Sequence, residues 1–204
     1  MQETAEITDK RLLRGARTRG IVLRRAVDLA SLEGLDHLSF GRLAGDTGLS
    51  KAGIQTLFRT KEALQLATVG FAREMFVDAV VRPAASAPRG LRRLSALLDR
   101  WAEYAEAPLF AGGCFWAANL AGFDSKAGPV RDALFRDQRE WRETLASELR
   151  YAVAAGEIAA LDIDLAAFQI DALLSAANTA LRTGDDDVVD KVRRIIDGSL
   201  TVRG

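Results

Sequence analysis

Apolar residues recur along the chain at intervals of three and four positions, and strict alternation of apolar and polar residues is rare. This spacing is typical of helices that bury one face. The four prolines all fall where the apolar period breaks, as expected of a residue that is tolerated only near helix ends: Pro83, Pro88, Pro108 and Pro129. The pattern therefore predicts an all-α protein of about nine helices.

Capping residues place the first helices. A helix over about 17–33 should end at Gly34, because glycine is favoured just after a helix. Ser39 and Ser50 are expected to cap two short helices, since a serine hydroxyl can accept a hydrogen bond from an amide of the first turn. Thr60 should cap a fourth helix that runs to about residue 82. Further helices are predicted over about 88–106, 114–121, 129–155, 165–183 and 186–200.

The two short helices are joined by a turn that contains Gly48. This is the spacing of a helix-turn-helix motif. In that motif the second helix enters the major groove, and residues of its N-terminal part meet base edges. The exposed positions of the second helix are expected to be Lys51, Ala52, Gly53, Gln55 and Thr56.

Charge is uneven along a chain of 204 residues whose formal net charge is zero. Between Lys10 and Lys61 there are eleven basic and four acidic residues. A folded basic segment indicates a polyanionic partner. On charge alone, a solvated helix face is the alternative interpretation.

The stretch from Thr18 to Leu66 resembles the TetR family of bacterial transcriptional regulators. The resemblance is carried by Ser39-Phe40-x-x-Leu43-Ala44, by the turn Gly48-Leu49-Ser50-Lys51 and by Phe58-x-x-Lys61-Glu62-x-Leu64. It implies a DNA-binding domain over residues 1–62 and a ligand-binding and dimerisation domain over 63–204. Gly112-Gly113-Cys114-Phe115 and Gly128-Pro129-Val130-Arg131 look like one branch of that family.

The resemblance also implies which residues meet DNA. Helix starts offer free amides to anions, so phosphate contacts are expected there, and Arg14 and Arg17 should form a flexible basic arm. Gln55 departs from the tyrosine that the family often has, but glutamine can read adenine. The expected DNA contacts are Thr18, Arg19, Ser39, Ser50, Lys51, Ala52, Gly53, Gln55, Thr56 and Lys61.

Aromatic residues with polar partners gather between positions 101 and 141. Ligand pockets are mostly apolar with a few placed polar groups, so this region is expected to bind a small apolar or aromatic effector. The alternative is that most of these rings are plain core. The candidate ligand contacts are Trp101, Tyr104, Phe110, Phe115, Trp116, Asn119, Phe123, Gln138, Trp141 and Asn178.

The last two predicted helices have broad apolar sides, and the resemblance implies that two copies form a four-helix bundle. Those sides comprise Leu165, Phe168, Ala172, Leu173, Ala176 and Ala180 on one helix and Val188, Val189, Val192, Ile195, Ile196 and Leu200 on the other. A dimer would read two DNA half-sites. Packing within one monomer is the alternative.

Other classes of function are disfavoured. The chain has one cysteine and one histidine, which leaves no ligand set for a CxxC-type or His-rich metal site. No phosphate loop or dinucleotide fingerprint is found, so no catalytic residues, metal or cofactor are expected. Cys114 is either a redox sensor or a small buried hydrophobe. No targeting or membrane-spanning segment is recognised, so a cytoplasmic location is expected.

These observations predict a ligand-responsive transcriptional regulator, most simply a repressor. It would bind a palindromic or pseudopalindromic operator as a homodimer and be released by its effector. The alternative is an all-α ligand-binding or interaction protein with weakened DNA binding, suggested by the missing aromatic residue at position 55.

Overall fold

The computed structural model describes the backbone of residues 2–200 and the side chains of residues 15–200. All regular structure in that part is helical, which confirms the all-α prediction. A π-helical segment, Val77–Val81, joins α4 and α5 into one continuous helix, so the described chain has nine helical rods besides a short 3-10 turn, Leu35–His37. The helices are α1 (Gln2–Glu33), α2 (Phe40–Thr47), α3 (Lys51–Phe58), α4 (Lys61–Phe76), α5 (Arg82–Ala84), α6 (Leu91–Glu106), α7 (Phe115–Phe123), α8 (Pro129–Ala154), α9 (Ile163–Arg182) and α10 (Val188–Leu200).

Helix ends follow the expected capping chemistry. The hydroxyl oxygens of Ser39, Ser50 and Thr60 accept from the third amide of α2, α3 and α4, at 3.1, 3.1 and 3.0 Å. Gly34 and Gly48 adopt positive φ values of 92° and 69° directly after α1 and α2. These conformations favour glycine because it has no Cβ.

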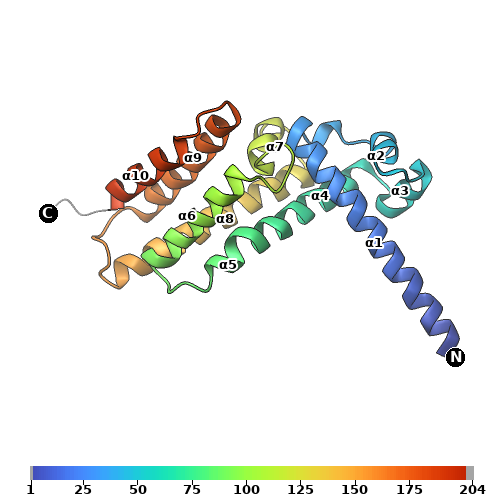
Figure 1. Ribbon diagram of the computed structural model, residues 1–204, viewed down its shortest axis with the longest axis horizontal. Helices are drawn as coiled ribbons and strands as arrows, with labels where there is room; N and C mark the ends of the chain where they lie inside the picture. Colours follow the sequence, from blue (N-terminus) through green and yellow to red (C-terminus); the bar gives the residue numbers. More distant parts are fainter. Residues whose placement is uncertain (1, 201–204) are drawn as a thin grey trace.

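The expected start of the first helix is wrong. We predicted a helix from about residue 17 with a flexible arm before it, but the backbone of α1 is already helical from Gln2. Residues 2–16 are mostly polar, so a search for a buried apolar stripe does not detect them. In Figure 1 this N-terminal part of α1 projects away from the rest of the molecule.

The elements form two ends joined by long helices. Figure 1 shows α2 and α3 beside α1 at one end, and α9 and α10 side by side at the other. Between them, α8 packs against α4, α6, α7 and α9, while α1 packs against α4 and α7. The buried apolar side chains form one continuous cluster from Val22 to Ile196.

The loop before α7 approaches the end of α1 very closely. The amide of Gly112 donates to Ser31 Oγ at 2.8 Å, and the amide of Ala111 donates to Asp28 Oδ1 at 3.2 Å. A Cβ atom on Gly112 would lie 2.0 Å from the carbonyl oxygen of Ser31. Because that neighbour is backbone, it cannot move aside as a flexible side chain would.

Gly112→Ala should therefore destabilise the protein by about 2–4 kcal/mol, since the added methyl group forces the loop away from α1. The measurement is the free energy of unfolding from urea titration. The matched control is Gly122→Ala in α7, where a Cβ meets no atom within 4 Å. That change should be neutral or stabilise the helix by up to ~1 kcal/mol. Equal stability of the two variants would contradict the close contact.

Candidate DNA-binding surface and effector cavity

The helix-turn-helix is held by a small apolar core. Leu43 of α2 and Ile54 and Phe58 of α3 are buried, and Phe40 and Leu49 pack against them partly exposed. Because these side chains face inward, the opposite face of α3 is turned to solvent. Its exposed residues are Lys51, Ala52, Gly53, Gln55, Thr56 and Arg59.

The five positions expected on the recognition helix therefore lie on one exposed face. Thr56 Oγ1 donates to the carbonyl oxygen of Ala52 at 2.9 Å, so its hydroxyl proton is engaged within the helix. No acidic side chain in the described part of the chain pairs with Lys51. A hollow of about 260 Å³ between α1 and α3 is lined by Thr18, Ser50 and Gly53 among others, so three expected DNA contacts adjoin one another.

Two basic candidates are tied to the protein. The guanidinium of Arg19 donates to the carbonyl oxygen of Leu57 at 3.2 Å and lies 4.5 Å from the centre of the Phe58 ring. It thus links α1 to the C-terminal end of α3. Lys61 Nζ donates to the carbonyl oxygen of Asp36 at 2.5 Å, which connects the start of α4 to the 3-10 turn.

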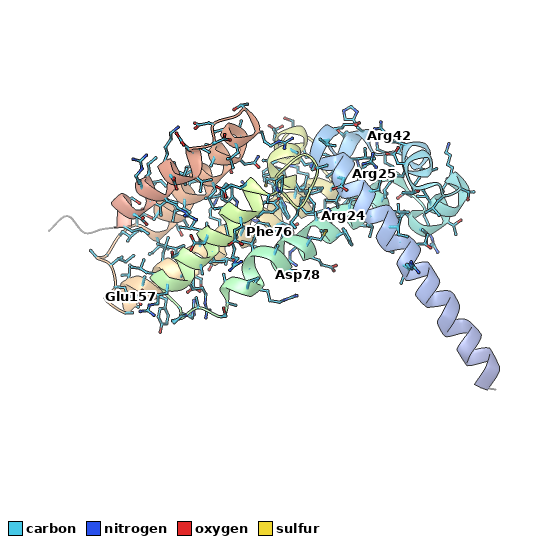
Figure 2. The ribbon with its side chains drawn as sticks, viewed as in Figure 1. Arg24, Arg25, Arg42, Phe76, Asp78 and Glu157 are labelled. Carbon is cyan, nitrogen blue, oxygen red and sulfur yellow. The ribbon has the colours of Figure 1, made fainter. Side chains whose placement is uncertain are left out.

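Part of the basic character is neutralised locally. Arg25 and Arg42 both reach Asp46, at 2.8 and 3.3 Å, and Arg42 also reaches Glu33 at 3.2 Å. The hydrogen bond and charge of Arg25, followed by Arg42, lower the pKa of Asp46 below its usual value. Figure 2 shows Arg25 and Arg42 near the crossing of α1 and α2. These arginines hold α2 against α1, and the two carboxylates balance their positive charge.

Arg59 was missed as a candidate and was counted only in the charge total. It follows α3 with a φ of 61°, the one positive φ among the described non-glycine residues. The amide of Thr60 donates to the carbonyl oxygen of Phe58 at 2.7 Å, which closes a tight three-residue turn around Arg59. Such turns are strained for residues with a side chain. The sequence carries no glycine or asparagine that would signal this conformation.

A cavity of about 290 Å³ lies among α4, α6, α7, α8 and α9. Its apolar walls come mainly from aromatic rings, and the π-helical segment contributes Val77 and Val81. π-helical turns are rare and frequent at functional sites. The cavity-lining residues are Arg73, Phe76, Val77, Val81, Trp101, Cys114, Trp116, Ala117, Leu120, Asp137, Gln138, Glu140, Trp141, Thr144, Asp171, Leu174, Ser175 and Asn178.

Of the ten expected ligand contacts, the structure brings five to this cavity: Trp101, Trp116, Gln138, Trp141 and Asn178. The other five lie outside its lining. Tyr104, Phe110, Phe115 and Phe123 are buried in the core, and Asn119 bonds to the backbone of the DNA-binding part. Aromatic content alone does not separate a ring that faces a cavity from one packed behind it.

Phe76 is the centre of the aromatic wall and was not a candidate. Its ring makes edge-to-face contacts with Tyr104, Trp116 and Trp141, each with 5.3 Å between centroids. Figure 2 shows Phe76 in the interior of the helical body. Such contacts fix ring positions beyond what burial alone provides, so the cavity has a defined shape.

Carboxylates also line the cavity and were missed. Asp137 and Asp171 are buried, and burial is the main cause that raises the pKa of each above its usual value. Arg136 and Arg142, respectively, oppose that shift. Asp137 lies four positions before Trp141 on the same face of α8, but that spacing does not show that the face borders a cavity, and Asp171 lies on α9.

Cys114 occupies the N-cap position of α7, without a capping hydrogen bond from its side chain, and lines the cavity half-buried. Its amide donates to Asn178 Oδ1 at 3.1 Å, and burial raises the pKa of its thiol. A raised pKa disfavours the thiolate, which is the redox-reactive form. Gly113 before it has a φ of 88°, so the two adjacent glycines serve a close approach and a left-handed turn.

Asn119 connects the cavity wall to the DNA-binding helices. Its amide nitrogen donates to the carbonyl oxygens of Ala30 and Phe115, at 3.1 and 2.7 Å, and its Oδ1 accepts from the amide of Leu35 at 2.7 Å. Gln65 of α4 donates to the carbonyl oxygen of Leu35 at 3.0 Å. The peptide groups of the turn between α1 and α2 are thus held by side chains of α7 and α4.

The described residues form neither a membrane-spanning helix nor a cluster of metal ligands. None of their helices combines the length and apolar character needed to cross a membrane. They contain no group of three or more histidine, cysteine or acidic side chains arranged to hold a metal ion.

Comparison with known proteins adds independent evidence. The model of the tetracyclin repressor-like C-terminal domain matches residues 90–196, and no curated protein matches the sequence. A TetR transcriptional regulator from Chloroflexus aurantiacus has 27% identity and a TM-score of 0.83, with 91% of this chain and 94% of that chain covered.

More distant solved structures share the fold. A TetR-family regulator from Cytophaga hutchinsonii has 21% identity and a TM-score of 0.77, covering 94% of this chain and 98% of that one. AibR, solved with isovaleryl coenzyme A and operator DNA, has 17% identity and a TM-score of 0.71, covering 86% and 95%. Since the family model spans more than half of the chain and the helix-turn-helix is in place, the chain belongs to the TetR family of transcriptional regulators.

Proposed function

We propose that this regulator is a homodimeric repressor that binds a palindromic or pseudopalindromic operator and leaves it when a small molecule occupies the cavity. The observation that carries the proposal is that α7 serves two sites. Through Cys114, Trp116, Ala117 and Leu120 the segment lines the cavity, and through Asn119 it holds the turn that leads into α2. Such a protein would act in the cytoplasm, where bacterial DNA is.

DNA binding would use the exposed face of α3. Lys51 at its start can reach a guanine edge or a phosphate, and Gln55 one turn later can pair with adenine. Gly53 and Ala52 allow the helix to approach the groove closely. Contacts to the phosphate backbone of the DNA would set the register of the protein on the duplex, and these would come from Thr18, Ser39, Ser50 and Lys61. Thr56 and Arg19 lie beside these residues, and Arg59 is an added candidate. In this proposal residues 1–62 form the DNA-binding domain and residues 63–204 the effector and dimerisation domain.

The dimer would form on α9. Leu165 and Phe168 are 52% and 53% exposed, and Ala172 and Ala176 continue the same exposed stripe at helical spacing. The contribution expected from α10 needs correction, because most of its apolar residues are buried within the chain: Val188, Val189, Val192 and Ile196. Ile195 is the large apolar residue of α10 that stays exposed, at 52%.

Release would follow from a change in the separation of the two recognition helices. Half-sites on DNA have a fixed spacing, so a small displacement of α2 and α3 in each protomer lowers affinity. An occupant of the cavity displaces α7, and Asn119 transmits that displacement to the turn after α1. AibR, which was solved with both a small molecule and operator DNA, is a member of the same fold in which both ligands bind. The coupling needs differential affinity of the occupant for the two conformations.

Replacing Lys51 and Gln55 together by alanine should weaken specific DNA binding at least about tenfold, since each side chain supplies base or phosphate contacts. The measurement is a titration of DNA upstream of the protein's own gene, or selected by the protein from random sequences, with unrelated competitor DNA. Binding of the parent protein should weaken linearly with the logarithm of salt concentration.

Lys191→Ala is the control for charge removal, because Lys191 lies on α10 and pairs with Asp185 at 2.8 Å. It should leave DNA affinity within about twofold of the parent. Unchanged binding by the double variant would favour a ligand-binding protein whose helix-turn-helix no longer reads DNA.

Phe168→Glu should dissociate the dimer. A symmetric interface would bury the new carboxylate twice. Burying a charge costs several kcal/mol that the nearby Arg142 would offset only in part, so the dimer dissociation constant should rise about a hundredfold or more. Light scattering coupled to size-exclusion chromatography gives the mass of the species. Tyr151→Glu is a matched control: Tyr151 is 44% exposed and, like Phe168, lies under an arginine guanidinium. A Phe168→Glu protein that stays dimeric would exclude this face of α9.

A further inference from the structure

The effector cavity has a distinctive composition. All three tryptophans of the chain line it: Trp101, Trp116 and Trp141. An apolar cavity of ~150 Å³ accepts one benzene ring, so a volume of about 290 Å³ suits a compact body of about two rings. Tryptophan faces also attract cations more strongly than other aromatic rings.

The charges around the cavity are unbalanced. Three carboxylates line it, those of Asp137, Glu140 and Asp171, against one cation, Arg73. Arg73 already donates to Glu140 at 2.5 Å and lies 3.6 Å from Asp137. The cavity-facing groups therefore carry more negative than positive charge.

The arginines that balance these acids stand outside the cavity lining. Arg136 reaches Asp137 at 3.2 Å with a side chain that is 55% exposed, and Arg142 reaches Asp171 at 3.0 Å with one that is 34% exposed. The side chains of Asp137 and Asp171 are only 2% and 9% exposed. Because water screens the exposed arginines more than the buried acids, these arginines offset the negative charge of the cavity lining only in part.

Two polar atoms at the cavity have no hydrogen-bond partner in the described structure. They are Oδ2 of Asp137, an acceptor, and Nε1 of Trp116, a donor, and both are buried. A buried polar atom without a partner costs about 1–3 kcal/mol, so native proteins rarely leave one. Both residues line the cavity, and a side-chain rotation on binding would bring either atom into reach of a bound molecule.

We propose that the effector is a compact organic cation: an apolar or aromatic body of about two rings with a protonated amine. The ammonium donates to Asp137 Oδ2 and lies among the tryptophan rings, and an acceptor atom on the body takes the N–H of Trp116. This inference rests on the proposed function and names the chemical class of its effector.

The same geometry disfavours acids of similar size. A carboxylate in the cavity would face Asp137 and Asp171 at close range, and like charges in a poorly solvated site repel strongly. Its natural partner, the guanidinium of Arg73, is already engaged by Glu140. Neutral molecules would gain the apolar contacts but leave Asp137 Oδ2 without a donor.

The test compares three molecules of nearly one shape with the full-length protein. Phenylpiperidine is the cation, phenyltetrahydropyran replaces its ring nitrogen by oxygen, and phenylcyclohexane carboxylate is the anion, each as the isomer with its groups at opposite ring positions. Phenylpiperidine has no acceptor atom for the Trp116 N–H, so this series tests the charge contact alone. Intrinsic tryptophan fluorescence reports binding, because every tryptophan lines the cavity. We expect the cation to bind about tenfold more tightly than the neutral ether and the anion to bind most weakly.

Asp137→Asn removes the charge while keeping the size of the side chain. The variant's dissociation constant for the cation should lie within about threefold of that for the ether. Its affinity for the ether should be unchanged, which would also show that the cavity is intact. Asp132→Asn is the matched control, since Asp132 is on the same helix, 72% exposed and outside the cavity lining. It should retain the tenfold preference.

Several outcomes would overturn the inference: the ether or the anion binds as tightly as the cation, the cation does not bind at millimolar concentration, or Asp137→Asn keeps the full preference. DNA binding is measured separately on the same preparation. A protein that prefers the cation but binds no DNA specifically refutes the proposed repressor and leaves the cavity assignment standing. A protein that binds DNA specifically but prefers the anion refutes the cavity assignment and leaves the proposed repressor standing.

Discussion

The side-chain amide of Asn119 is the contact on which the arrangement of the two ends depends. It is 1% exposed and makes three hydrogen bonds, two of them to the end of α1 and to the turn that follows. Buried amides are costly unless every group is paired. The position of α7 relative to the helix-turn-helix is therefore fixed by these directional hydrogen bonds as well as by apolar packing. Gly112, in the loop before α7, allows the two segments to approach closely enough.

In the proposed mechanism, this junction is the means by which a cavity in the C-terminal part would influence helices at the other end. The segment from Cys114 to Leu120 is both a wall of the cavity and a support of the turn before α2. Gln65 holds the same turn from α4, and α4 continues through Phe76 into the cavity wall. Two helices thus run from the cavity to the DNA-binding part, and a body that spreads the cavity acts on both. Packed interfaces of this kind tend to have discrete arrangements instead of deforming smoothly.

The fold and the recognition helix could be predicted from the sequence because their signals are local. Ser39, Ser50 and Thr60 cap the helices where the spacing predicts. The cavity was predicted only in part, since whether a ring faces a cavity or the core depends on distant helices: Trp116 and Phe115 are neighbours in sequence, and only Trp116 lines it. The roles of Asn119, Asp137 and Phe76 arise from contacts between residues at least forty positions apart in the sequence, and no local pattern encodes them.

The central claim is that α7 couples the cavity to the DNA-binding helices through Asn119. The most direct test is the dissociation constant for the selected DNA, with and without saturating phenylpiperidine, in the parent protein and in Asn119→Ala. The account predicts that the molecule weakens DNA binding about tenfold or more in the parent and less than about twofold in the variant, while binding the cavity of both. A full effect in a folded Asn119→Ala protein would contradict it and place the coupling elsewhere.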